Sequence, residues 1–468
     1  MILADLGAEV IKVEKPGSGD ETRKWGPPFV TGSRETCYFV GLNRNKKSIC
    51  LDLKTKEGRN VILDLSKECD VLIENYVPGK LDALGLGYDN IKKIAPHLIY
   101  CSLTGYGSKG PYKNKPGYDV IAASIGGLMS ITGPRNGPPC KVGVAMTDIA
   151  TGLYAHGAIL AALLYRMKTG KGQRIDCNLL STQVSCLINI GSNYLNANED
   201  GLKWGNSHVS IVPYRAYETL DDQFITIGAG SDAQFSELCK KLQIHKVAFD
   251  DKFMHNQDRV NNRNELDNII QNELKKRTLS DWLMAFEGSS FPFGPVNKIS
   301  QVFDDDHIRN IDLVKEVHHP VAGKLKLVGP PVEFSECKNV INSPPPLLGE
   351  HTNDVLRNIL NYSSEKVEKL KKLGSDVGAT VRLKLRKPKS SKKVNWMEGT
   401  IDNENMDKKK SKCCCIYKKP QVENDSSSSE DENECEHCQG HVEKNKRSQK
   451  GNPPTKSTES HQQSMIAA

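Results

Sequence analysis

The first 180 residues alternate short β-branched segments with helical ones, and this alternation limits the fold more than any other feature. Strand signals fall at residues 9–14, 48–53, 70–74 and 98–103, and helical stretches at 56–67 and 90–95 lie between them. Strands separated by helices predict βαβ units, in which parallel strands form a sheet covered by helices. We therefore expect an α/β fold with a doubly wound sheet.

The chain opens on a helical segment at residues 1–6 instead of on a strand. Doubly wound sheets begin with a strand, so we expect the natural first strand to be missing from this sequence. Asp5 and Glu9 follow closely, which fits neither a secretory signal nor an Arg-rich mitochondrial presequence. The start of the chain therefore leaves the compartment open, with the cytoplasm as the expectation where no other signal directs the protein elsewhere.

With 468 residues, the chain is long enough for two or three domains with buried cores. Its net charge of +7 is concentrated near the C-terminus, where residues 364–468 contain 22 basic and 16 acidic residues. Residues 1–363 are nearly balanced in charge, so the body shows no basic excess for nucleic acid or a membrane surface. The longest charge-free run, at residues 149–165, is short for a membrane-spanning helix.

Changes of composition divide the chain into four parts. We expect residues 1–200 to form the first part of a large domain, 212–305 a smaller α+β domain, and 306–362 a return to the large domain. From residue 363 onward lysine, serine and acidic residues dominate. Such a composition cannot bury enough apolar surface to offset its ordering entropy, so residues 363–468 are expected to form a disordered tail.

Asp148 begins the most helix-like segment, residues 148–167, which is apolar all round and predicts a buried central helix. One interpretation is structural, with Thr147 or Asp148 as the N-cap. The other is chemical, because a carboxylate held away from bulk water can attack an acyl carbonyl and carry the acyl group covalently. The flanking Gly143 and Gly152 would let a substrate approach the backbone. The two roles are compatible.

A small-residue loop, Gly228-Ala-Gly230, follows the strand signal at residues 223–227. It could close over a substrate, offer backbone N–H groups to an anion, or serve as a plain turn. The loop lacks the spacing of a dinucleotide-binding motif or of a P-loop. Residues 1–363 also lack a His, Cys and carboxylate cluster with metal-ligand spacing, so we expect no metal in the body.

Six motifs, in order along the chain, resemble those of the class III CoA-transferases over residues 1–362. They are LGAEVIKVEKPGSGD at 6–20, NKKSICLDLK at 45–54, ENYVPGKL at 74–81, PGYD at 116–119, TGKGQRID at 169–176 and LLGEHT at 347–352. Within the family the chain is most similar to the succinate–hydroxymethylglutarate CoA-transferases, which are mitochondrial. The resemblance implies a Rossmann-like large domain, a small domain, and two chains interlocked as a homodimer.

The resemblance also implies roles for individual residues. Asp148 would attack an acyl-CoA to give a mixed anhydride and free CoA thiolate, and the thioester of an acceptor acid would form afterwards. Coenzyme A is then a substrate, moved from a succinyl-CoA-like donor to a dicarboxylic acid such as hydroxymethylglutarate or glutarate, without a redox cofactor. The residues implied to line the CoA site, the reacting centre and a lid are Lys15, Leu51, Lys54, Asn75, Tyr76, Tyr118, Gly228 and Gly230.

The expected tail carries a second group of motifs. Lys393, Val394 and Trp396 form a basic, β-branched and aromatic pattern whose two apolar side chains share one face when extended, which suits addition to the edge of a partner's sheet. Cysteines and histidines cluster further on, and they could hold zinc or remain reduced and unliganded. They are Cys413, Cys414, Cys415, Cys435, His437, Cys438 and His441.

Residues 380–447 resemble the inhibitor-three family of type 1 protein phosphatase inhibitors, on the segments at 383–388, 392–396, 402–406 and 411–420. That family is mostly disordered and is also credited with a ring-like ubiquitin-ligase activity. The resemblance implies that Val394 and Trp396 dock in a hydrophobic groove of the phosphatase catalytic subunit. Two functions would then share one chain, as in a gene fusion. In the alternative interpretation, a phosphatase inhibitor or ubiquitin-ligase-like protein carries an inactive, truncated transferase body.

Overall fold

Parallel strands separated by helices build the first part of the chain. The structure, a computed structural model, describes residues 1–372. β1 (Val10–Glu14) pairs with β2 (Lys46–Cys50), and β3 (Val71–Glu74), β4 (Ile99–Thr104) and β5 (Arg174–Asn178) form a second sheet in that order. All of these pairings are parallel, which confirms the expected α/β fold.

Alternate residues of β4 face different helices, since successive side chains of a strand point to opposite faces. Tyr100 packs with Ile91 of α5 (Tyr88–Ile94), whereas Cys101 packs with Ile159 of α7 (Met146–Thr169). The other helices of this part are α1 (Ile2–Asp5), η1 (Glu21–Lys24), α2 (Cys37–Leu42), α3 (Lys56–Glu68), α4 (Lys80–Ala83), α6 (Asp119–Ile125), η2 (Met129–Ile131), α8 (Leu179–Ser185) and α9 (Ile188–Ala197).

The helix that carries Asp148 differs from its prediction in two ways. α7 begins at Met146, and its N-cap is Ala145, so neither Thr147 nor Asp148 is the N-cap. The helix is also not buried all round, because a row of apolar side chains faces outward: Leu153 is 51% exposed and Leu164 62% exposed. The prediction of a buried central helix is wrong for the single chain, since apolar composition does not say which neighbour covers each face.

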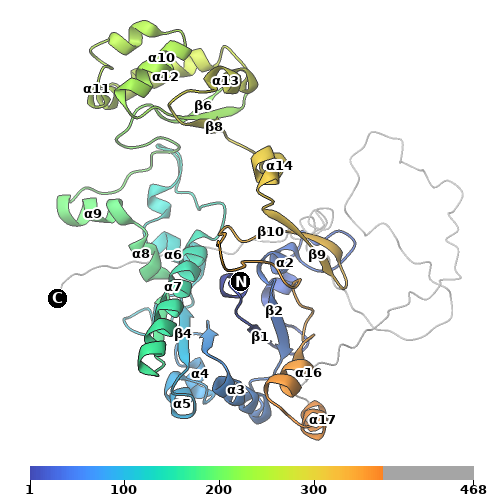
Figure 1. Cartoon of the computed structure of the whole chain (residues 1–468). Coiled ribbons are helices and arrows are strands. Elements are labelled where there is room, and N and C mark those ends of the chain that lie inside the picture. Colours follow the sequence, from blue (N-terminus) through green and yellow to red (C-terminus); the bar gives the residue numbers. More distant parts are fainter. Residues whose placement is uncertain (373–468) are drawn as a thin grey trace, which may run out of the picture. The chain divides into compact units, whose positions relative to one another are not determined.

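α7 is long and apolar enough, by length and composition alone, to cross a membrane. It is longer than the charge-free run considered from the sequence, because it extends past it at both ends. However, Ala155 and Ile159 pack onto side chains of β4 and β5, and Figure 1 shows the helix running beside β4. These contacts make α7 part of the α/β domain.

The segment from Tyr214 to Pro295 builds a separate antiparallel sheet with its own core. β6 (Tyr214–Glu218), β7 (Phe224–Gly228) and β8 (Phe293–Pro295) pair in that order. Ile225 of β7 shares a fully buried cluster with Phe235, Ile270 and Phe286 from the helices. These helices are α10 (Asp232–Lys241), η3 (His245–Phe249), α11 (Asn256–Asn261), α12 (Arg263–Leu274) and α13 (Leu279–Phe286).

The last described part of the chain extends the body further than the sequence predicts. It contains α14 (Ile299–Asp304), α15 (Asp306–Asn310), a hairpin of β9 (Val314–His319) and β10 (Gly323–Val328), α16 (Thr352–Asp354) and the π-helix η4 (Val355–Ile359). α17 (Ser364–Lys372) follows, and its Val367 and Leu370 are buried with Ile49 of β2. The predicted start of the tail at residue 363 is therefore wrong. The sites expected at 393–441 lie outside the described residues.

Candidate active site

Asp148 lies in the first turn of α7, where backbone N–H groups have no partner within the helix. Asp119, the first residue of α6, supplies the missing acceptor. Its Oδ1 accepts the N–H of Thr147 at 2.8 Å and the N–H of Asp148 at 3.2 Å. The helix that carries the candidate nucleophile is therefore capped by a carboxylate from a different helix.

The pKa of Asp148 is raised above the usual range of an aspartate. Partial desolvation by the surrounding chain is the main cause, and the negative charge of Asp119 adds to it. The residue is nevertheless exposed in the single chain, so the expected shelter from bulk water is not provided by this chain alone. A higher pKa makes a deprotonated carboxylate more basic, which favours attack on an acyl carbon.

Two further residues brace the start of α7. Thr147 is buried, and its hydroxyl donates to Oε1 of Gln183 in α8 at 2.8 Å. Gly126, at the end of α6, leaves space for Gln183, because a Cβ at this glycine would lie only 2.5 Å from the Cγ of Gln183. Contacts with both α6 and α8 thus fix the backbone next to Asp148.

Tyr118 is the N-cap residue of α6 and directly precedes Asp119. Its side chain is 69% exposed, so the ring is available to a ligand or to another chain. Because Asp119 is bonded to the backbone of Asp148, Tyr118 and Asp148 lie in one neighbourhood. Gly143 and Gly152 border open space, since a Cβ on either would meet no atom within 4 Å.

Lys15, Leu51 and Lys54 follow the carboxyl ends of β1 and β2, the edge at which parallel sheets usually bind ligands. The carbonyl oxygen of Glu14 accepts the N–H of Leu51 at 3.0 Å, which ties the two strand ends together. Lys15 and Lys54 are exposed. The side chain of Leu51 packs into the core and is 2% exposed, so it does not face a ligand.

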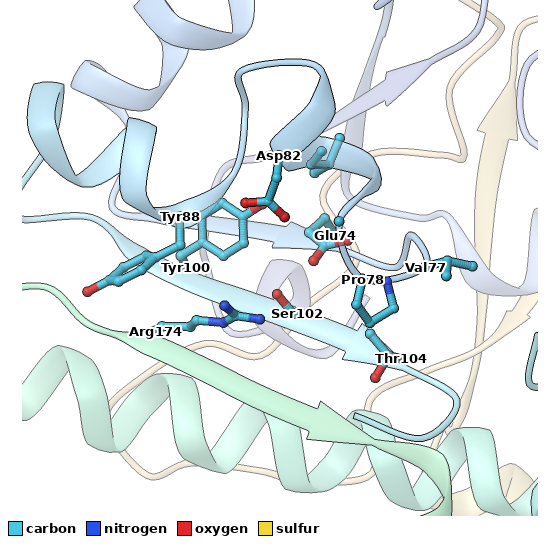
Figure 2. Close-up of a pocket in the computed structure, with 11 residues that line it drawn as sticks. Glu74, Val77, Pro78, Asp82, Tyr88, Tyr100, Ser102, Thr104 and Arg174 are labelled. Atoms are coloured by element: carbon cyan, nitrogen blue, oxygen red, sulfur yellow. The ribbon is translucent and has the colours of Figure 1, made fainter. Parts of the chain in front are cut away.

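Asn75 and Tyr76 follow β3 and lie in the chain between Glu74 and Val77, which line a pocket. Figure 2 shows this pocket. The pocket is lined by Glu74, Val77, Pro78, Gly79, Leu81, Asp82, Tyr88, Tyr100, Ser102, Thr104 and Arg174. Figure 2 shows Ser102 and Thr104 along β4, with the side chain of Arg174 extending toward Ser102. Glu74 Oε2 accepts the N–H of Tyr76 at 2.7 Å and so fixes the start of the loop. This pocket does not include Asp148.

The Gly228-Ala-Gly230 loop is held more firmly than its composition suggests. The N–H groups of Gly228 and Ala229 donate to the carbonyl oxygens of Pro292 and Pro213 at 2.9 and 3.0 Å, and Ala229 is fully buried. Ser231 then caps α10. Because two N–H groups are engaged within the small domain, they are not free to bind an anion in this conformation.

Sequence reasoning missed several residues that shape the site. Asp119 stands in the PGYD motif, but no local pattern links it to a helix that begins many residues later. The polar face of β4 could be predicted from the sequence, because Ser102 and Thr104 alternate with Cys101 and Leu103. Such alternation indicates one apolar and one polar face, and in the structure the first packs against α7 while the second lines the pocket.

Comparison with known families places the chain in a class. The model of CoA-transferase family III matches residues 1–352, which is more than half of the sequence. The chain belongs to CoA-transferase family III, and the enzyme class expected from the sequence is confirmed. A second family model, described as a protein phosphatase inhibitor, matches residues 380–434, outside the described part of the structure.

Two similar proteins have named activities. Succinyl-CoA:glutarate CoA-transferase of Homo sapiens is 50% identical over 374 residues, which are 80% of this chain and 85% of the relative. Succinate–glutarate CoA-transferase of Agrobacterium fabrum is 41% identical over 363 residues, which are 76% of this chain and 90% of the relative. Both are named for glutarate, which corrects the expected similarity to hydroxymethylglutarate enzymes.

A solved structure supports the same class. The crystal structure of a CAIB/BAIF family protein from Brucella suis has a TM-score of 0.69 and 40% sequence identity to this chain. The match covers 77% of this chain and 93% of the Brucella protein. The fold therefore agrees with the class that the family model gives.

Proposed function

We propose that this protein transfers CoA from succinyl-CoA to glutarate, forming glutaryl-CoA and succinate. The observation that carries the proposal is the placement of Asp148 in the first turn of α7, with its backbone held by Asp119 and its pKa raised. Such a carboxylate can act as a nucleophile toward a thioester. The names of two relatives supply the pair of substrates.

The proposed reaction consists only of acyl transfers among the CoA thiolate, the carboxylate of Asp148 and the two acids. A carboxylate oxygen of Asp148 attacks the thioester carbonyl of succinyl-CoA, the C–S bond breaks, and CoA thiolate leaves a mixed anhydride. The thiolate then attacks the side-chain carbonyl of Asp148, so that a thioester forms on Asp148 and succinate departs. Each step forms one acyl bond and breaks another, so no electron is gained or lost.

The second half of the reaction mirrors the first. A carboxylate of glutarate attacks the thioester on Asp148, which releases the thiolate and forms a second mixed anhydride. The thiolate attacks the glutaryl carbonyl, and glutaryl-CoA leaves with Asp148 restored as a carboxylate. The chain must therefore hold CoA near Asp148 throughout, while the two dicarboxylates exchange.

The CoA site is proposed at the carboxyl ends of the parallel strands. Lys15 and Lys54 are exposed cations on the β1–β2 edge, and phosphate groups are natural partners for such ammonium groups. Asn75 and Tyr76 lie in the chain between Glu74 and Val77, two residues that line the pocket, and the exposed ring of Tyr76 could stack on a base. Gly228 and Gly230 are proposed to lie in a lid.

The active form is proposed to be a homodimer. The outward face of α7 and the helix α9 expose large apolar side chains, among them Leu153, Leu164, Ile188 and Leu195. Large apolar side chains that gather on the surface often mark contact sites between proteins. A second copy packed there would also remove water from around Asp148, which is exposed in the single chain.

The substrate pair can be tested with the purified chain. Succinyl-CoA is mixed with glutarate or with hydroxymethylglutarate, and the CoA thioesters are separated and identified by mass. The proposal predicts glutaryl-CoA as the preferred product. Formation of hydroxymethylglutaryl-CoA at a higher kcat/KM would overturn the assignment of the acceptor, and hydrolysis without transfer would overturn the reaction itself.

A second function is proposed for the C-terminal segment, on the basis of the inhibitor match at residues 380–434. Val394 and Trp396 would dock on the catalytic subunit of type 1 protein phosphatase, with Lys393 beside them, and the Cys/His cluster at 413–441 could bind zinc. The chain would then join a transferase with an inhibitor segment.

A further inference from the structure

Glu14, the last residue of β1, has a buried side chain that is only 1% exposed. Its carboxylate accepts hydrogen bonds from four donors: Nε and Nη2 of Arg23, each at 2.7 Å, Oγ of Ser48 at 2.6 Å and the N–H of Asp20 at 3.0 Å. Four is about the number that a carboxylate can accept. The buried charge is therefore fully paired.

The bond to Asp20 closes the turn that contains Lys15. Within this turn the carbonyl oxygen of Lys15 accepts the N–H of Gly19 at 2.8 Å. Gly19 has a φ of +62°, and a Cβ there would lie 2.9 Å from Oε2 of Glu14 and 2.8 Å from Cδ of Arg23. The turn thus packs directly against the Glu14–Arg23 pair, and only glycine fits at its end.

The same carboxylate connects distant parts of the chain. Ser48 lies on β2, and its Oγ accepts the N–H of Gly349 at 2.9 Å, while Arg23 donates to the carbonyl oxygen of Pro346 at 3.1 Å. Three of the six family-like motifs, at 6–20, 45–54 and 347–352, therefore meet around Glu14. The bond to Ser48 gives Gly349 of the LLGEHT motif a structural role beside Glu14.

Arg23 makes a further contact on its other side. The guanidinium of Arg23 lies 3.7 Å from the ring centre of Phe39, which is fully buried. Burial alone would raise the pKa of Glu14, but the hydrogen bonds from Arg23 and Ser48 hold it below the usual range of a glutamate. Glu14 therefore keeps its charge, and its donors stay in place, at neutral pH.

We propose that Glu14 is a positioning residue for CoA: it fixes the Lys15 turn and the β2 edge so that the ammonium of Lys15 meets the phosphates of CoA. This inference rests on the proposed CoA site at the ends of β1 and β2. Glu14 itself is buried, so it acts through Lys15 and does not touch the ligand. Its loss should weaken CoA binding more than it slows acyl exchange.

The test compares Glu14→Gln, Lys15→Ala and the double variant, using the full chain. Dissociation constants for free CoA are measured by calorimetry, and KM and kcat by product formation from succinyl-CoA and glutarate. Loss of a charge-assisted bond predicts that Glu14→Gln raises the Kd for CoA and the KM for succinyl-CoA about tenfold. The KM for glutarate and kcat should change less than about twofold. In the Lys15→Ala background, Glu14→Gln should cause no further loss.

Asp5→Asn is the matched control, because Asp5 and Arg44 form a second buried ion pair, with contacts of 2.9 and 2.7 Å. It should lower Tm as Glu14→Gln does and leave the Kd for CoA unchanged. Ser48→Ala, which removes a single donor, provides a milder variant should Glu14→Gln fail to fold, and it should raise the Kd for CoA about threefold.

Two results would overturn the positioning role. One is that the effects of Glu14→Gln and Lys15→Ala on the Kd for CoA add up in the double variant. The other is that Glu14→Gln or Ser48→Ala destabilises the protein and leaves the Kd for CoA unchanged. The calorimetric measurement separates this inference from the proposed reaction. A chain that binds CoA but transfers nothing contradicts the reaction, and the Kd values still decide the role of Glu14. A wild-type chain that does not bind CoA contradicts both.

Discussion

Asp119 caps the helix of Asp148, since its Oδ1 accepts the backbone N–H of Asp148 at 3.2 Å, and its charge also raises the pKa of the Asp148 carboxyl. One side chain therefore holds the backbone of the candidate nucleophile and adds to the desolvation that raises its pKa. The nucleophile must be deprotonated, so kcat/KM should rise with pH and level off above the raised pKa of Asp148.

Asp119→Asn should move this acidic limb to lower pH. The amide oxygen can still accept the two N–H groups, but the like charge that raises the pKa of Asp148 is gone. Asp119→Ala loses the cap as well, and should lower the free energy of unfolding by about 1 kcal/mol. The measurement is kcat/KM against pH, with the exposed Asp89→Asn as a control that leaves the limb in place. If the acidic limb of kcat/KM stays at the same pH in Asp119→Asn, the limb does not report the deprotonation of Asp148.

Gly126→Ala should destabilise the protein and slow catalysis. The new Cβ would lie 2.5 Å from Cγ of Gln183 and 2.8 Å from the carbonyl oxygen of Ala122, so the helices must shift. Overpacking of this kind costs about 1–3 kcal/mol. Because Gln183 bonds to Thr147, the shift reaches the start of α7 and should lower kcat. Gly143→Ala meets no atom within 4 Å and is the control for stability by thermal unfolding.

Leu164→Asp should convert the proposed homodimer into monomers. Leu164 is 62% exposed on the apolar outer face of α7, and a carboxylate buried between two chains would lose its hydration without gaining a partner. The mass in solution, measured by light scattering, reports the change. Met284→Asp alters a side chain of similar exposure on α13 and should leave the mass unchanged. A wild-type monomer would contradict the proposed dimer.

Much of the fold was predictable because its signals are local. The strand expected at 98–103 is β4 (Ile99–Thr104), since its alternation and β-branched content fit a strand. The strand expected at 48–53 begins earlier, at Lys46, because pairing with Val10 of β1 draws two lysines into the ladder. The start of β2 is therefore set by its pairing with β1, which cannot be predicted from the local sequence.

The remaining differences have physical reasons. α17 was assigned to the tail because lysines and glutamates dominate it, although Val367 and Leu370, three residues apart, form the apolar stripe of a surface helix. The cap by Asp119 joins two helices, so no window of sequence reveals it. The outward apolar face of α7 could not be told from a buried one, because both have the same composition.

The inhibitor-like segment makes its own prediction. Val394→Ala combined with Trp396→Ala should remove binding to the catalytic subunit of type 1 protein phosphatase, because the two apolar side chains would carry the docking. Calorimetry or co-purification with the phosphatase measures the loss. CoA transfer by the same variant should be unchanged, since the transferase family match ends at residue 352. Undiminished phosphatase binding would contradict the docking role.

The covalent role of Asp148 is the central claim, and trapping tests it most directly. The protein is incubated with succinyl-CoA and hydroxylamine, which cleaves mixed anhydrides and thioesters to hydroxamates, and its peptides are analysed by mass spectrometry. We expect a hydroxamate on Asp148, absent without succinyl-CoA, and a loss of transfer of roughly a thousandfold or more in Asp148→Asn. A fully active Asp148→Asn protein, or modification only at another carboxylate, would contradict the account.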